Sequence, residues 1–238
     1  MNSRFLGLLL FFLSFNTLLS QENDVIHQDL LWGRYNLKFQ VSEKWTPYFD
    51  VEERVYLSSL RQHHLLPSLG INYKLNENLS FTTALLYFEL TLPQDANANT
   101  IERSRELWPL LAVNFKHDVS SKFTFLSRLK SEIRFKQRAS NAYTFRNIRL
   151  RMRLGLIYKI TSKLKAIVKE ETLINLRSDE IRTVFDQNRF SAGINYKIDD
   201  RFAIEAGYLN WFQQRPNTEN FVNRNIAYFT VLHNLKLF

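Results

Sequence analysis

The sequence predicts an all-β protein, a transmembrane antiparallel up-and-down β-barrel of ten to twelve strands, with twelve preferred. Three observations predict it: strict alternation of apolar and polar residues, a hairpin unit that recurs along the chain, and an N-terminal export signal. In such a barrel every strand alternates because one face contacts lipid and the other lines a polar interior. Short turns at one end and long loops at the other are expected, periplasmic and extracellular respectively.

Alternation is clearest from Asn147 to Ile160, where a single residue, Ile157, breaks the two-residue period. On a helix the three arginines of this stretch would be spread around the axis, whereas on a strand they share one face. One half-buried strand of a soluble β-sandwich has the same local pattern, so the rest of the chain must decide. The alternate positions fall into two sets, which we call parities. One parity carries Arg149, Arg151 and Arg153, and the other is apolar, with Ile148, Leu150, Met152, Leu154, Leu156, Tyr158 and Ile160.

A hairpin unit recurs about every forty residues, which is the length of one hairpin per repeat. The segments 70–75, 155–160 and 193–198 match closely, and 112–117 and 36–41 are looser copies. Each copy precedes a short polar turn. An aromatic residue near each turn is predicted to form a ring at one membrane interface, although a soluble β-meander could repeat a core tyrosine in the same way. These residues are Tyr73, Phe115, Tyr158 and Tyr196.

The returning strands at 123–136 and 202–212 alternate well, whereas those at 79–92 and 164–176 alternate poorly. In the last of these, Glu170 would face lipid unless a β-bulge changes the parity. Five hairpins and a final strand give eleven strands. Single-chain bacterial barrels have even numbers, so 24–31 is the candidate for a twelfth.

The N-terminus has the organisation of a secretory signal peptide, covering residues 1–20, and the barrel domain then covers 21–238. Arg4 precedes an apolar run that ends before Ser20. An uncleaved anchor helix is the competing interpretation, but the run is shorter than the ~20 residues of a membrane span. We therefore expect export to the outer membrane of a Gram-negative bacterium, with outer-membrane lipid around the barrel. The terminal Phe238 indicates recognition of the last strand by the barrel assembly machinery.

Composition excludes several functional classes. The chain has no cysteine, and its five histidines lack metal-site spacing, so we expect no metal and no cofactor. The formal charge of +9 is compatible with a protein that binds nucleic acid. However, the bases alternate with apolar residues inside strands, and we expect no nucleic-acid partner. A mean hydropathy of −0.28 excludes a helical membrane bundle but not a β-barrel.

Several short motifs occur in combination along the chain: Arg128, Lys130, Glu132, Arg134 and Phe135, the run Gln187-Asn188-Arg189 followed by Gly193 and Tyr196, Gly207-Tyr208, and Glu53-Arg54. Together these motifs resemble the family catalogued as domain of unknown function 2490. The resemblance covers nearly all of the mature chain and implies an outer-membrane β-barrel of Gram-negative bacteria. The family has no established activity, so it implies no catalytic residues.

The inward-facing parity is predicted to carry a charged network. Bases facing lipid at the midplane cost ~2–4 kcal/mol each, so these residues must face a lumen. An open lumen would make a small passive or anion-preferring channel. If glutamates pair with the bases, the barrel is plugged and structural or adhesive, with Trp211 and Phe221 near the loop tips. The predicted lumen residues are Arg128, Lys130, Glu132, Arg134, Arg149, Arg151, Arg153, Glu171 and Arg189.

A lipid hydrolase is the alternative from a different class, and we expect the protein not to be an enzyme. Such a hydrolase needs a Ser-His pair, and paired histidines in a polar loop are more often simply solvated. The oligomeric state is left open. Candidates for the pair are His63 or His64 with Ser58, Ser59 or Ser68.

Overall fold

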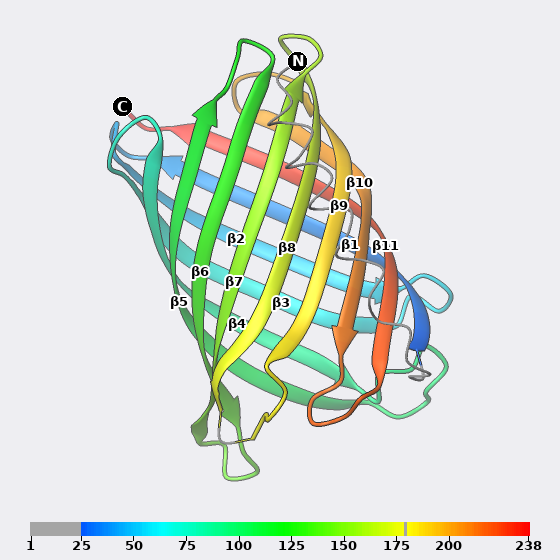
Figure 1. Cartoon of the computed structure of the whole chain (residues 1–238). Helices are drawn as coiled ribbons and strands as arrows, with labels where there is room; N and C mark the ends of the chain where they lie inside the picture. The colour runs from blue at the N-terminus through cyan, green and yellow to red at the C-terminus, as the bar shows by residue number, and fades with distance from the viewer. Residues whose placement is uncertain (1–24, 179) are drawn as a thin grey trace, which may run out of the picture.

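The computed structural model describes residues 25–178 and 180–238, so the predicted signal peptide at 1–20 lies outside the described residues. All of its strands form one closed barrel (Figure 1), as the sequence predicts. No helix in the described ranges is long and apolar enough to cross a membrane. The strands are β1 (Val25–Gln40), β2 (Trp45–Tyr56), β3 (Gln62–Lys74), β4 (Leu79–Leu92), β5 (Glu102–Asp118), β6 (Phe123–Gln137), β7 (Tyr143–Lys159), β8 (Leu164–Ser178), β9 (Phe185–Lys197), β10 (Phe202–Gln214) and β11 (Phe221–Lys236).

Each strand pairs antiparallel with its neighbour in the chain, and β1 closes the barrel by pairing in parallel with β11, from Val25↔Phe221 to Gln40↔Lys236. An odd number of up-and-down strands makes this parallel closure necessary. Eleven strands fall within the predicted range of ten to twelve. The preferred count of twelve is not found in the described residues, because 25–31 and 36–40 belong to the single strand β1 instead of two.

The two ends of the barrel differ in their connections. At one end, here the turn end, five connections of four residues each join the strands; at the other, the loop end, they have five to nine. In every tight turn a side-chain oxygen accepts the backbone amide three residues further on, for example Asn76 Oδ1 from Leu79 N at 2.8 Å. The predicted asymmetry of turns and loops is therefore present. It is smaller than predicted, because the strands extend into segments that the sequence predicts as loops.

The outer face of the barrel is apolar. Leu69 and Leu111 leave about two thirds of their surface exposed there. The four predicted interface aromatics lie next to the turns, and Tyr158 and Tyr73 pack against Phe123 and Trp45. Three of the four, Phe115, Tyr158 and Tyr196, are exposed on the outer face.

Four β-bulges lie near the loop end, at Arg54/Val55, Arg134/Phe135, Ile148/Arg149 and Leu173/Ile174. The bulge in β8 is on the loop side of Glu170, so it does not change the parity of this residue. Glu170 pairs across the sheet with Leu154 and Phe190 on the outer face and accepts a hydrogen bond from Asn188.

Candidate functional site

The barrel encloses a cavity of about 330 Å³, lined by side chains from every strand. This volume is in the range of pockets that hold small molecules, ~300–1,000 Å³. Three loop residues, Gln94, Ile181 and Pro216, also line it at the loop end. The interior has a charged wall, formed by the inward residues of β5 to β9, and an aromatic wall, formed towards the loop end of β1, β2, β10 and β11. The inward positions of β1 and β2 also carry Arg34, Asp50, Glu52 and Arg54.

Glu132 is the centre of the charged wall and is completely buried. Arg149 Nη2 lies 2.6 Å from its Oε2, and Lys130 Nζ and Arg151 Nη1 each lie 2.8 Å from its Oε1. One carboxylate therefore neutralises three bases only in part. Hydrogen bonds to both oxygens make removal of this carboxylate costly, because the bases would be left facing each other.

Glu171 is the second centre. Arg128 Nη2 and Arg151 Nη2 each lie 2.5 Å from one of its oxygens, whereas Arg189 Nη1 is 3.9 Å away. Arg151 thus bridges Glu132 and Glu171 and connects strands β6, β7 and β8. The network is continuous across the wall.

The alternation of inward and outward residues did not predict two members of the network, Arg146 and Asp186. Each is the extra residue at a β-bulge, which turns its side chain towards the interior. Arg146 forms an ion pair with Glu106, and Asp186 Oδ2 lies 2.9 Å from Arg149 Nη1. The only sequence signal for these bulges is the break in alternation near 145–147 and 185–187.

The charged wall has more bases than carboxylates. Arg153 lines the cavity but forms no ion pair or hydrogen bond with the described residues. All nine predicted lumen residues lie in this wall, and all except the deeply buried Glu132 line the cavity itself. Nine bases face four carboxylates in this wall: Arg128, Lys130, Arg134, Arg146, Arg149, Arg151, Arg153, Lys169 and Arg189 against Glu106, Glu132, Glu171 and Asp186.

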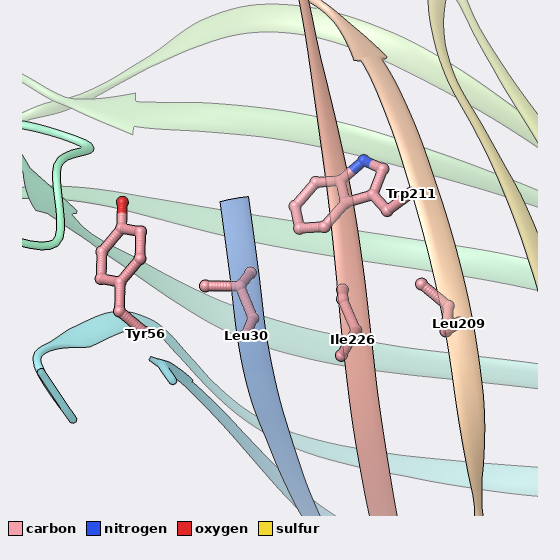
Figure 2. Close-up of a cluster of buried hydrophobic side chains, with 5 residues drawn as sticks. All are labelled: Leu30, Tyr56, Leu209, Trp211 and Ile226. Atoms are coloured by element: carbon pink, nitrogen blue, oxygen red, sulfur yellow. The ribbon is translucent and has the colours of Figure 1, made fainter. Parts of the chain in front are cut away.

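The aromatic wall is an apolar cluster of Leu30, Tyr56, Leu209, Trp211 and Ile226, inside the barrel (Figure 2). Trp211 is 2% exposed, so its predicted place at a loop tip is wrong. Phe221 is also misplaced by the prediction, because it is buried at the start of β11. Phe221 is misplaced because β11 extends into the segment predicted as a loop, whereas Trp211 lies within the predicted strand at 202–212 and is buried because its side chain lines the cavity. Leu66, Phe88 and Trp108 form a second, smaller cluster across the cavity.

The paired histidines are not in a loop. His63 and His64 are buried at the start of β3, against Tyr56 and Trp211, so the interpretation of solvated loop histidines is wrong. His64 Nδ1 lies 3.3 Å from Arg54 Nη1. In the described structure neither histidine is hydrogen-bonded to a serine hydroxyl, and Ser58 and Ser59 are exposed in the loop after β2.

Nearer the turn end, smaller polar contacts join the strands. Lys169 Nζ and Tyr228 Oη lie 2.8 and 3.2 Å from Glu205 Oε1. Tyr228 lies directly over Gly193 and Gly207, where a β-carbon would overlap its hydroxyl. Two of the recurring glycines of the hairpin unit, Gly70 and Gly193, are thus required by the close approach of a tyrosine ring, that of Tyr48 or Tyr228, whereas Gly155 has no tyrosine beside it. No cluster of three or more metal-binding side chains occurs within residues 25–178 and 180–238.

An apolar exterior and a charged, cavity-containing interior define the class: a closed β-barrel with an apolar outer face and a polar lumen. The chain belongs to the family described as "Protein of unknown function (DUF2490)", whose model matches residues 30–222. The resemblance in the sequence motifs is thereby confirmed.

Similar solved structures are also β-barrels of named channels. The "NanC porin structure in rhombohedral crystal form" has a TM-score of 0.49 and 12% identity, covering 82% of this chain and 94% of that one. The "TodX deltaS2S3 mutant monoaromatic hydrocarbon channel" has a TM-score of 0.38 and 11% identity, covering 76% and 52%. No curated protein matches the sequence.

Proposed function

We propose that the protein is an outer-membrane β-barrel that forms a small passive channel with a preference for anions. The observation that carries this proposal is the excess of bases among the residues that line the cavity, eleven bases against five carboxylates. Export through the signal peptide at 1–20, surrounding outer-membrane lipid, and assembly through the C-terminal strand ending at Phe238 belong to the same proposal.

The exterior supports a membrane location. Leu111, Met152 and Phe229 each expose about half or more of their surface on the outer face. Soluble monomers rarely expose apolar patches beyond a few hundred Å². A closed sheet leaves no unpaired edge amides, which is the condition for a sheet to survive in hydrocarbon.

The interior supports the anion preference. Fixed guanidinium groups along a narrow lumen lower the energy of an entering anion and raise that of a cation. Arg153 contributes most directly, because it has no carboxylate partner among the described residues and so keeps its whole charge for the lumen. The paired arginines contribute less, since Glu132 and Glu171 already face them.

Planar-bilayer recording of the purified protein under a KCl gradient tests the proposal. We expect discrete channels whose reversal potential favours chloride. In Arg153→Glu the anion-to-cation permeability ratio should fall about two- to fivefold, because the substitution reverses a charge that lies close to a passing ion in a water-filled pore. Lys163→Glu makes the same charge change in an exposed turn and is the matched control. Equal ratios for the native barrel and Arg153→Glu would contradict the assignment of Arg153 to the conducting path.

A plugged structural or adhesive barrel is the second candidate. Its specific support is the continuous ion-pair network, together with Gln94, Ile181 and Pro216 from the loops, which reduce the space inside the barrel. The same recording separates the two candidates, because an inserted barrel that shows no conductance would favour the plugged one. Lipid hydrolysis has no specific observation in its favour, and we assign no catalytic role to His63 or His64.

A further inference from the structure

Arg189 is a buried base without a close counter-charge. It is 8% exposed, and its nearest carboxylate oxygen, on Glu171, is 3.9 Å away. Its guanidinium carbon instead lies 4.6 Å from the centre of the Trp211 ring. A guanidinium has five N–H donors, yet none of those on Arg189 is hydrogen-bonded to a described protein group. Buried charges are normally paired, so these donors are available to a ligand.

Further unused donors surround the same point. Arg54 Nε, Trp32 Nε1 and Trp211 Nε1 are shielded from solvent and have no hydrogen-bond partner in the described structure. All three residues line the cavity with Arg189. Arg54 lies over both indole rings, 4.0 Å from the centre of Trp32 and 4.9 Å from that of Trp211. A group that satisfies this set must accept hydrogen bonds and not donate them.

A third guanidinium adds positive charge behind the site. Arg224 lies 4.3 Å from the centre of the Trp211 ring and is 1% exposed. It donates only to neutral amide oxygens, those of Gln28, Gln213 and Gln94, at 2.8, 2.7 and 3.0 Å. Three guanidiniums therefore surround one indole, and the adjacent carboxylate is Glu52, which is paired with Arg54.

We propose that Arg54, Arg189, Trp32 and Trp211 bind the carboxylate or phosphate group of a small solute at the loop end of the lumen. The guanidinium and indole N–H groups donate to the oxyanion, with the charge-assisted bonds supplying most of the affinity. The partly exposed indole ring of Trp32 contacts the apolar part of the solute. This site deepens the proposed channel function, and only the route by which solutes arrive depends on that function.

Binding is measured on the full-length barrel in detergent micelles, by tryptophan fluorescence, at constant ionic strength. Sodium acetate and inorganic phosphate are the probes, and glycerol is the neutral control. We expect a saturable change with at least one of the two anions, and their relative Kd values distinguish carboxylate from phosphate. Arg189→Gln should weaken binding by about tenfold or more, the effect of losing charge-assisted hydrogen bonds.

Two further variants keep the test decisive. Arg189→Lys retains the charge but loses the planar fork, so its Kd should lie between those of the native barrel and Arg189→Gln. Lys38→Gln removes a charge from the inward face of β1 near the turn end and should leave Kd unchanged within about twofold, because screened charges at that distance contribute little. Heat-modifiable migration on a gel confirms that each variant is folded.

A linear, unsaturable response to both anions, or equal Kd values for the native barrel and folded Arg189→Gln, would overturn the site. Bilayer recording of the same preparation separates this result from failure of the channel. Saturable binding to a non-conducting barrel leaves the site standing and removes the channel. Anion conduction without saturable binding leaves the channel standing and removes the binding site.

Discussion

The two walls of the lumen are buried in the same barrel but stabilised by different physics. In the charged wall, Glu132 and Glu171 hold bases from neighbouring strands through ion pairs with distances of 2.5–2.8 Å. In the aromatic wall, Leu30 and Ile226 pack against Trp211 as in the core of a soluble protein. The charged wall therefore holds most of the excess positive charge, whereas the aromatic wall supplies shape and stability and adds Arg54 and Arg224 at its edge.

The two walls meet at Trp211. Its ring belongs to the apolar cluster, yet Arg54, Arg189 and Arg224 lie over it within 5 Å. Cation–π contacts of this kind are stronger where water is excluded. The junction therefore combines positive charge from both walls with the rigidity of the apolar cluster, as a solute-binding site requires.

Glu132→Gln should have the largest effect on stability. It leaves Lys130, Arg149 and Arg151 without their shared carboxylate, and loss of one partner from a buried ion pair costs about 3–5 kcal/mol. Urea unfolding in lipid vesicles, followed by fluorescence, measures the loss. Glu77→Gln, in an exposed turn, is the control and should change stability by less than about 0.5 kcal/mol. A loss below about 1 kcal/mol in Glu132→Gln would mean that the charged wall does not depend on this carboxylate.

Ile226→Ala tests the aromatic wall and should cost about 2–4 kcal/mol, because it opens a cavity in a fully buried cluster. Raising KCl should not change this loss, since no charge is involved. Ile194→Ala, on the exposed outer face, is the matched control and should cost less. Equal losses in the two variants would show that the cluster is not packed as a core.

Gly193→Ala should cost about 1–3 kcal/mol, because the added methyl group overlaps the Tyr228 hydroxyl and displaces it from Glu205. The same unfolding assay measures it. Gly33→Ala is the control, since a β-carbon there meets no atom within 4 Å, and its stability should stay within about 0.5 kcal/mol of native. Adding Tyr228→Phe to Gly193→Ala should recover part of the loss. Absence of any recovery would contradict the close approach of ring and glycine.

Arg153→Gln should have the smallest effect on stability, less than about 1 kcal/mol, because the residue has no ion pair in the described chain. It should still lower the anion preference of the channel, which separates charge used for folding from charge available to a solute. If this substitution destabilises the barrel as much as Glu132→Gln does, Arg153 belongs to the structural network and the comparison of the two kinds of charge fails.

Alternation along the chain was sufficient to predict the barrel and the inward face of its charged strands. The nine lumen residues share parities that a barrel can place only inside, so their side of the sheet follows from spacing alone. The ion-pair partners could not be predicted in this way. Arg149 reaches Asp186 two strands away, and such pairs depend on the stagger of the closed barrel.

The remaining differences come from local breaks in the pattern. The bulges bring Arg146 and Asp186 inward against their parity. Strands that continue past polar segments bury His63 and Phe221, which the sequence places in loops. Polar residues near a strand end are compatible with a longer strand or with a loop, because their hydrogen bonds can be made in the lumen of the barrel as well as in water.

The reversal potential of the native barrel in a planar bilayer, under a KCl gradient at neutral pH, tests the central claim most directly. An excess of bases over carboxylates around the cavity predicts a zero-current potential of the sign expected for chloride permeation, and a shift towards zero in Arg153→Glu. A potential of the opposite sign, with Arg153→Glu unchanged, would contradict the claim that the charged wall sets the selectivity of the lumen.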